Sequence, residues 1–251
     1  MATELVLLGT AGYIPHGSRE TCCALLRRDD AAVLIDAGSG VRRLVEQPDL
    51  LAGVRRLDVL LTHFHLDHTI GLSFVPALRL ERLPEIHGPG AALYGTPTDA
   101  ILRRVFSRPQ SAFGLEVVGR AAEVRIPEHR IGPFTFRLRR QPLHTDATIG
   151  IRLDDAFALC TDTEADPETP GFARGVRTLL HDMWALADDI DRIPGMHTSA
   201  ADAARDLPGD AGGPRPRHDP RLAPPYRPSV LAARAGGTCR PRRLAPHPQA
   251  A

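Results

Sequence analysis

The sequence has 251 residues, of which 43% are hydrophobic and 24% are charged, and its formal net charge is +1. This length and composition are typical of one α/β domain, and the small net charge indicates neither a nucleic-acid nor an acidic partner. No apolar run approaches the roughly 18 residues of a membrane helix, which excludes a membrane-spanning protein. The first residues lack the regions of a secretory signal, so we expect a cytoplasmic location. The four cysteines match no disulfide or CxxC pattern and are expected to be reduced thiols.

Short apolar runs alternate with helical patterns over the first 206 residues. The apolar runs predict buried strands at Glu4–Leu8, Cys22–Leu26, Ala32–Ile35, Leu57–Leu61, Ile86, Glu123–Ile126, Phe134–Arg139, Ile149–Leu153 and Phe157–Cys160. Helical spacing predicts helices at Val41–Glu46, Ile70–Leu80, Thr98–Phe106, Phe172–Leu180 and Ser199–Arg205. This order of elements favours sheets sandwiched by helices.

The last 45 residues differ in composition from the preceding chain. Residues 207–251 contain ten of the 23 prolines, and eight arginines against two aspartates. A Pro- and Gly-rich segment without apolar periodicity buries too little surface to offset its ordering entropy, so we expect a poorly ordered tail. A solvated tail and a nucleic-acid arm are two interpretations. We favour a third interpretation, in which the tail is the product of a frameshift. The whole sequence lacks Lys and Asn, which suggests a GC-rich gene, and such a gene read out of frame yields mostly proline, arginine, alanine and glycine.

A dense group of potential metal ligands follows the strand predicted at Leu57–Leu61. Residues 62–68 have the sequence THFHLDH, which places three imidazoles and one carboxylate at the carboxyl end of a strand. Sheets of α/β proteins bind ligands at this edge, and histidines buried without partners cost free energy, so a structural cluster is the weaker alternative. Imidazoles mixed with a carboxylate, without thiolates, favour zinc, manganese or iron.

The pattern His-x-His-x-Asp-His at residues 63–68 resembles the metal-binding motif of the metallo-β-lactamase superfamily. The segments Leu8–Gly12 and Ile35–Gly40 are similar to two early motifs of its ribonuclease Z-like and phosphodiesterase branches. On their own these segments would be explained as tight glycine turns. The resemblance implies a metal-dependent hydrolase with a four-layer αββα sandwich over residues 1–206.

The resemblance also implies a complete set of ligands for two divalent ions, zinc first, with manganese or iron as alternatives. The implied ligands are His63, His65, Asp67, His68, His144 and Asp162. His144 would complete a first site with the two leading histidines of the motif, and the last two residues of the motif would supply a second site. Asp162 would bridge the ions, since each carboxylate oxygen can bind one cation. A surface histidine and a turn aspartate are the alternatives for these two residues.

Two later residues resemble the ribonuclease Z pattern in which an acidic residue orients a histidine that protonates the leaving oxygen. Asp182 would be the acidic residue and His197 the proton donor, unless His197 is only the histidine at a helix start. In this mechanism a metal-bridging hydroxide attacks phosphorus and the cations take up charge on the oxygens. With Asp67, these two residues form the expected catalytic set.

The expected substrate follows from a departure from the family pattern. Ribonuclease Z enzymes that process transfer RNA carry a long arm between the residues that match His144 and Asp162, and here those residues are only 18 positions apart. A small or cyclic phosphodiester is therefore the expected substrate, with an RNA 3' end as an alternative. Another ester or a lactone ranks lower, because the thiol of true β-lactamases is missing from the second site. A homodimer is left open.

The end of the chain departs further from the family. An apolar strand and a last histidine ligand should follow the helix at Ser199–Arg205, but residues 208–216 contain no apolar run. We therefore expect the sandwich to lack its last strand. That His218 is the missing ligand without its strand is the less favoured alternative. The alternative function is a catalytically impaired metal-binding domain with an incomplete second site.

Overall fold

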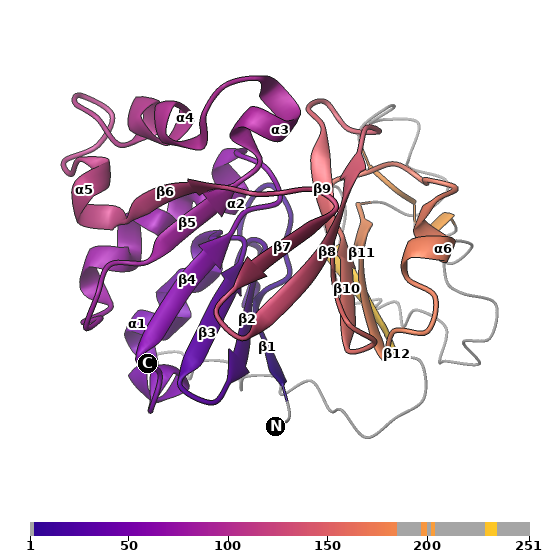
Figure 1. Cartoon of the computed structure of the whole chain (residues 1–251), viewed down its shortest axis with the longest axis horizontal. Coiled ribbons are helices and arrows are strands. Elements are labelled where there is room, and N and C mark those ends of the chain that lie inside the picture. Colours follow the sequence, from indigo (N-terminus) through magenta and orange to yellow (C-terminus); the bar gives the residue numbers. More distant parts are fainter. Residues whose placement is uncertain (1–2, 185–196, 200–201, 204–228, 235–251) are drawn as a thin grey trace. The chain divides into compact units, whose positions relative to one another are not determined.

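The computed structural model describes residues 3–184, 197–199, 202–203 and 229–234. Within these residues the chain forms two compact units, and each unit contains its own six-stranded sheet. The first unit ends at Val124 and the second begins at Arg125. Two sheets with helices packed on them confirm the predicted mixed α/β class (Figure 1). Of the helices in the described ranges, none has the length and apolarity to cross a bilayer.

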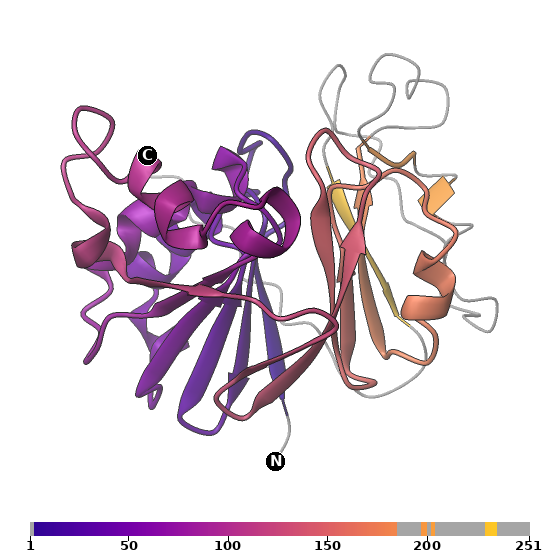
Figure 2. The same cartoon turned by 45° about the horizontal axis from the view of Figure 1, so that its top comes forward.

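The first sheet has the strand order β1-β2-β3-β4-β5-β6 and twists as a fan (Figure 2). Strands β1 to β3 run antiparallel, and β3 to β6 run parallel. β3 is buried at every residue, as expected for a parallel strand covered on its faces. The strands are β1 (Glu4–Gly9), β2 (Cys23–Arg28), β3 (Ala31–Ile35), β4 (Arg56–Leu60), β5 (Glu85–Gly88) and β6 (Arg120–Glu123).

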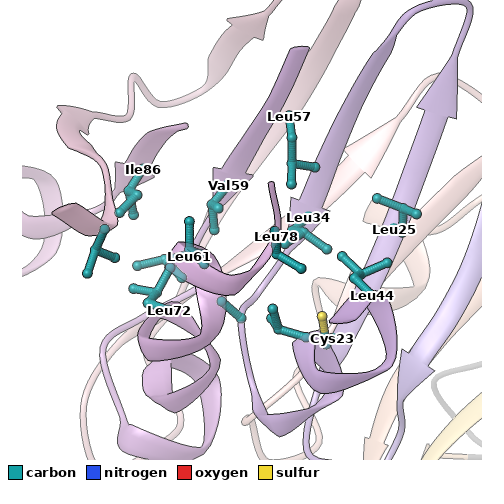
Figure 3. Close-up of a cluster of buried hydrophobic side chains, with 14 of the residues drawn as sticks. Cys23, Leu25, Leu34, Leu44, Leu57, Val59, Leu61, Leu72, Leu78 and Ile86 are labelled. Atoms are coloured by element: carbon teal, nitrogen blue, oxygen red, sulfur yellow. The ribbon is translucent and has the colours of Figure 1, made fainter. Parts of the chain in front are cut away.

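Helical segments pack their apolar side chains onto this sheet. Figure 3 shows Leu44 and Leu72 beside Leu34 and Val59 of the strands, and all four side chains are buried. This continuous core holds the strand ends in place. The segments are η1 (Ser39–Val41), α1 (Arg42–Glu46), η2 (Pro48–Leu51), α2 (Leu66–Thr69), η3 (Ile70–Ala77), α3 (Gly90–Tyr94), α4 (Thr98–Val105) and α5 (Leu115–Val118).

The second sheet has the order β12-β11-β10-β9-β8-β7, and all its pairs are antiparallel except β10 with β11. Burial alternates along most of β8, so one of its faces packs against the core. Phe172 and Val176 cover Ala158 and Leu179 in a second apolar cluster. The elements are β7 (Glu128–Ile131), β8 (Phe134–Gln141), β9 (Thr148–Leu153), β10 (Phe157–Cys160), α6 (Thr169–Phe172), β11 (Thr178–Met183) and β12 (Ser229–Arg234).

Three predicted elements differ in the structure. The helix predicted at Phe172–Leu180 is wrong, because α6 ends at Phe172 and Thr178–Met183 is a strand that pairs on both edges. The segment predicted as a helix at Ile70–Leu80 is a 3-10 helix containing Pro76, which cannot donate a backbone hydrogen bond. The strand predicted at Glu123–Ile126 is displaced toward Arg120–Glu123, where β6 pairs with β5.

The tail contributes a strand that the composition did not predict. Ser229–Arg234 forms β12 and pairs antiparallel with the whole of β11. Its sequence SVLAAR contains a short apolar run that the surrounding proline and arginine obscure. The other residues of the 207–251 segment, including His218, lie outside the described residues.

We predict that truncating the core of the first sheet costs far more stability than truncating its surface. Leu34→Ala should lower the free energy of unfolding by about 2–5 kcal/mol, because its side chain is fully buried in β3. Leu83→Ala is the matched control, since Leu83 is 37% exposed and should change the same quantity by less than about 0.5 kcal/mol. Urea unfolding followed by circular dichroism measures both, and equal losses would contradict the core assignment.

Candidate metal centre

The loop between β4 and α2, extending into α2, carries the four ligands predicted for the first unit. His63 and His68 are buried, whereas His65 and Asp67 are half-buried. The ring centroid of His63 lies 4.4 Å from that of His65 and 4.3 Å from that of His68. Three imidazoles this close would repel one another if charged, whereas neutral imidazoles offer three lone pairs to a cation. The loop therefore concentrates nitrogen ligands in a small volume.

Hydrogen bonds to Asp36 and Thr62 set the tautomers of two of these histidines. Nδ1 of His68 donates to Oδ2 of Asp36 over 2.8 Å. The Thr62 hydroxyl donates to the Asp36 carboxylate, whose two oxygens both lie at 3.0 Å. Because the single hydroxyl proton is used in this bond, the hydroxyl oxygen acts as an acceptor for the N–H at Nδ1 of His63, which lies at 3.0 Å. Each imidazole then carries its lone pair on Nε2, as in metal-binding histidines whose Nδ1 is fixed by an outer partner.

Close backbone packing places Asp36 against the histidine loop. Asp36 directly follows β3 with a φ of 55°, a left-handed conformation that aspartate tolerates better than branched residues. Its Oδ1 also accepts from the Thr62 backbone N–H at 2.7 Å. A Cβ on Gly71 would lie 2.1 Å from the carbonyl oxygen of Gly38, so only glycine fits there. The glycine motif at Ile35–Gly40 is thus a structural support of the histidine loop.

The second unit brings together His144, Asp162 and His197. One potential ligand atom from each lies within 4.8 Å of the others. Nε2 of His144 is 3.9 Å from Oδ1 of Asp162, and the ring centroids of His144 and His197 are 5.0 Å apart. His144 comes from the β8–β9 connection and Asp162 follows β10, so strand ends again supply the polar side chains.

A buried network holds the backbone at Asp162. This residue has a φ of 49°, and its Oδ2 accepts from the Thr161 hydroxyl at 2.8 Å. Nε2 of Gln141 donates to the carbonyl oxygen of Thr161 at 2.9 Å and to the Thr148 hydroxyl at 2.8 Å. The Thr148 hydroxyl is in turn 3.3 Å from the carbonyl oxygen of Asp162. These bonds stabilise a strained turn that presents the carboxylate.

His197 is held by the predicted acidic residue. Its Nδ1 lies 2.9 Å from Oδ2 of Asp182, a carboxylate on β11 that also accepts from the Thr163 N–H at 3.3 Å. The indole of Trp184 stacks on the imidazole, with centroids 4.1 Å apart and ring planes 13° apart. As with His63 and His68, fixing Nδ1 leaves Nε2 as the atom that can bind or transfer a proton.

Sequence reasoning missed three residues that support the site. It treated Asp36 as part of a glycine turn and assigned no role to Thr62 or Trp184. The signal for Asp36 was its position at the end of β3, since the carboxyl ends of parallel neighbours meet at one edge. Neither Thr62 nor Trp184 belongs to a pattern of known spacing, so their roles become visible only from the packing.

A further cluster with ligand-like spacing, Asp58, Glu85 and His87, is an ion-pair network. The Asp58 carboxylate accepts from Arg56 at 2.5 Å and from Arg82 at 2.7 Å. The two guanidinium groups compensate the buried charge and oppose a cation. Burial lowers the pKa of His87, which favours its neutral form in this cluster.

Two of the three described cysteines are poor candidates for thiolate ligands, whereas Cys22 lies with Asp36 and His68 in a group whose potential ligand atoms are within 4.8 Å of one another. Cys22, Cys23 and Cys160 are all buried and free of disulfides. Burial raises the pKa of Cys160 to about 11 and raises that of Cys23 well above its ordinary value. Both thiols therefore stay protonated near neutral pH, when they are poor metal ligands.

Residues 31–213 match the model of the beta-lactamase superfamily domain. The chain belongs to this superfamily. A ribonuclease Z of Streptomyces avermitilis is 28% identical over 83% of this chain and 81% of its own length. The match and this relative together identify the chain as a ribonuclease Z-like hydrolase of the superfamily.

Solved structures agree on the fold. The metallo-beta-lactamase fold protein YhfI of Bacillus subtilis aligns with a TM-score of 0.63 and 17% identity over 81% of this chain and 80% of its own. The short form of human tRNase Z aligns with a TM-score of 0.57 and 16% identity over 82% of this chain and 87% of its own. At such identities the likeness establishes the metallo-β-lactamase fold and leaves the substrate to other arguments.

The fold implies divalent metal ions, and the residues present fit them. The first unit offers three crowded imidazoles and a carboxylate, and the second offers two imidazoles and a carboxylate. Nδ1 of His63, His68 and His197 has an oxygen partner in each case, which leaves Nε2 for a cation or a proton. This donor chemistry suits borderline divalent cations.

We predict that Asp36→Asn weakens metal binding about 10- to 100-fold, because asparagine keeps the shape but replaces one acceptor oxygen by a donor. Asparagine also tolerates the left-handed φ, so the backbone should be retained. The matched control is Asp29→Asn, an exposed residue with a φ of 57° in the β2–β3 turn. Isothermal titration of the apoprotein with zinc measures the affinity, and equal affinities in the two variants would contradict a supporting role for Asp36.

Proposed function

We propose that this chain hydrolyses phosphodiesters with two divalent cations, zinc first and manganese or iron as alternatives. The proposed ligands are those implied by the family motif, namely His63, His65, Asp67, His68, His144 and Asp162. His63, His65 and His144 would form one site, and the other three residues would serve the second ion, with Asp162 bridging. Family membership supports this set of ligands.

The observation that carries the proposal is the Asp182–His197 pair within the second unit. A histidine whose Nδ1 is held at 2.9 Å by a buried carboxylate presents Nε2 within a restricted range of directions. Its ring lies beside His144, one of the proposed ligands. A superfamily hydrolase that places an oriented histidine next to its metal ligands has the parts needed to protonate a leaving oxygen.

When bound, the two cations supply activation of a water nucleophile and neutralisation of charge on the phosphoryl oxygens. The residues of this chain do the remaining work. Asp36 and Asp182 accept the Nδ1 protons of His68 and His197, and His197 in its protonated form, which carries a second proton on Nε2, would give that proton to the departing alkoxide. Asp67, whose Oδ2 lies 3.3 Å from Nε2 of His68, would contribute its carboxylate to the second ion and complete the proposed catalytic set.

A small or cyclic phosphodiester is the proposed substrate class. The 18 positions from His144 to Asp162 are occupied by β9, β10 and their short connections, so no long arm extends between these residues. Without such an arm, a folded RNA has fewer contacts with the backbone phosphates. An RNA 3' end is the alternative substrate, and the similarity to a ribonuclease Z favours it. The proposal also places the protein in the cytoplasm and includes a homodimer, which sedimentation analysis tests.

We predict that His63→Ala and Asp162→Ala each lose metal and nearly all phosphodiesterase activity, because a centre lacking one ligand no longer fixes its cation. Elemental analysis of the purified variants and turnover of bis(p-nitrophenyl) phosphate measure the two effects. His16→Ala is the control, since His16 is exposed and lies outside the proposed ligand set. Full metal content in both ligand variants would refute the assignment. One ion or none in the unmodified chain, without turnover, would favour the impaired metal-binding domain.

We predict that His197→Ala keeps its metal but loses about 10²- to 10⁴-fold in turnover of substrates with poor leaving groups. Substrates with a p-nitrophenolate leaving group need little protonation and should lose much less. Turnover rates for an alkyl phosphodiester and for bis(p-nitrophenyl) phosphate give the comparison. An equal loss for the two leaving groups would argue against proton donation by His197.

A further inference from the structure

Trp184 is the only tryptophan of the chain, and it directly follows β11. Its backbone N–H donates to the carbonyl oxygen of Thr198 at 3.0 Å, which ties it to the residue after His197. The Thr198 hydroxyl donates to the carbonyl oxygen of Thr163 at 2.6 Å. These bonds join the segments on either side of His197 to the connection after β10. Trp184 is therefore fixed in relation to His197 by its backbone as well as by its ring.

The Asp182 carboxylate alone leaves His197 one free motion. The imidazole turns about its Cβ–Cγ bond, and a single hydrogen bond at Nδ1, which tolerates a range of angles, restricts this rotation without stopping it. A flat indole that lies 4.1 Å away with a tilt of only 13° blocks this rotation on one side. Two constraints of different kinds, one in the ring plane and one on its face, then define where Nε2 points.

We propose that Trp184 is a positioning residue that aims Nε2 of His197 at the leaving oxygen. The inference rests on the proposed role of His197 as proton donor. Proton transfer depends on donor geometry, and a misplacement of about 1 Å is enough to cost on the order of 100-fold in rate. Removing the indole should therefore slow only the steps that need a well-placed proton. Substrate binding and metal content should stay unchanged.

The kinetic test compares Trp184→Leu with Trp184→Phe on two leaving groups. Trp184→Leu should lower kcat about 10- to 100-fold for an alkyl phosphodiester, with less than about a twofold change for bis(p-nitrophenyl) phosphate and an unchanged KM. Trp184→Phe keeps a flat ring and should restore most of the rate. Phe113→Leu is the matched control, because Phe113 is 46% exposed and should leave both rates unchanged. If the leucine variant fails to fold, Trp184→Met replaces it, whereas loss of metal from a folded variant would overturn a purely positioning role.

The double variant separates the two proposals. In the His197→Ala background, Trp184→Leu should cause no further loss, because the residue that it positions is absent. A leaving-group effect in His197→Ala but none in Trp184→Leu overturns the role of Trp184 alone. The absence of that effect in His197→Ala overturns the proposed function, and with it this inference.

Fluorescence tests the contact without turnover. Iodide quenching of the single tryptophan in the metal-free protein should increase in His197→Ala, because the imidazole no longer covers one face of the indole. His16→Ala should leave the quenching unchanged. Identical quenching in His197→Ala and the unmodified chain would overturn the inference, since the stacking on which it depends would not exist in solution.

Discussion

The histidine loop of the first unit depends on the hydrogen bonds that the Asp36 carboxylate accepts. The carboxylate accepts hydrogen bonds from the Thr62 backbone, the Thr62 hydroxyl and Nδ1 of His68, so one buried side chain ties the end of β3 to the histidine loop. A buried carboxylate is costly unless its lone pairs are used, and here several donors converge on it. The same bonds that offset burial also select the tautomer of two imidazoles. Stability and ligand geometry are therefore set by one residue.

In the second unit, too, a buried carboxylate fixes Nδ1 of a histidine. Asp182 on β11 fixes His197 as Asp36 fixes His68, with Nδ1-to-carboxylate distances of 2.9 and 2.8 Å. Asp36 and Asp162 both follow a strand in a left-handed conformation, with φ of 55° and 49°. Such backbone strain costs about 1–3 kcal/mol per residue and persists where surrounding bonds hold it. In both units a strand of the sheet is followed by a strained turn that carries a carboxylate.

The sequence was most informative where residue type and spacing both carry information. The ligand run at residues 62–68 and the strands before it could be predicted, because buried parallel strands have continuous apolar runs and clustered histidines are rare. The first half of β11, Thr178–Leu180, was mistaken for the end of a helix, since a short apolar run fits both periodicities and only the two pairing partners of the strand decide. β12 was missed because a local apolar run was averaged into a proline-rich segment. The stacking of Trp184 depends on the chain's path in space and leaves no local pattern.

The pairing of β12 connects Ser229–Arg234 to the strand that carries Asp182. Val230 lies opposite Asp182 in the register of β12 and β11, and the pairing runs the full length of both strands. β11 is thereby an interior strand with partners on each side, instead of an edge open to pairing with other chains. The carboxylate that holds His197 thus sits on a strand whose second flank comes from residues about 50 positions later. Loss of the carboxy-terminal segment would turn that carboxylate's strand into a fraying edge.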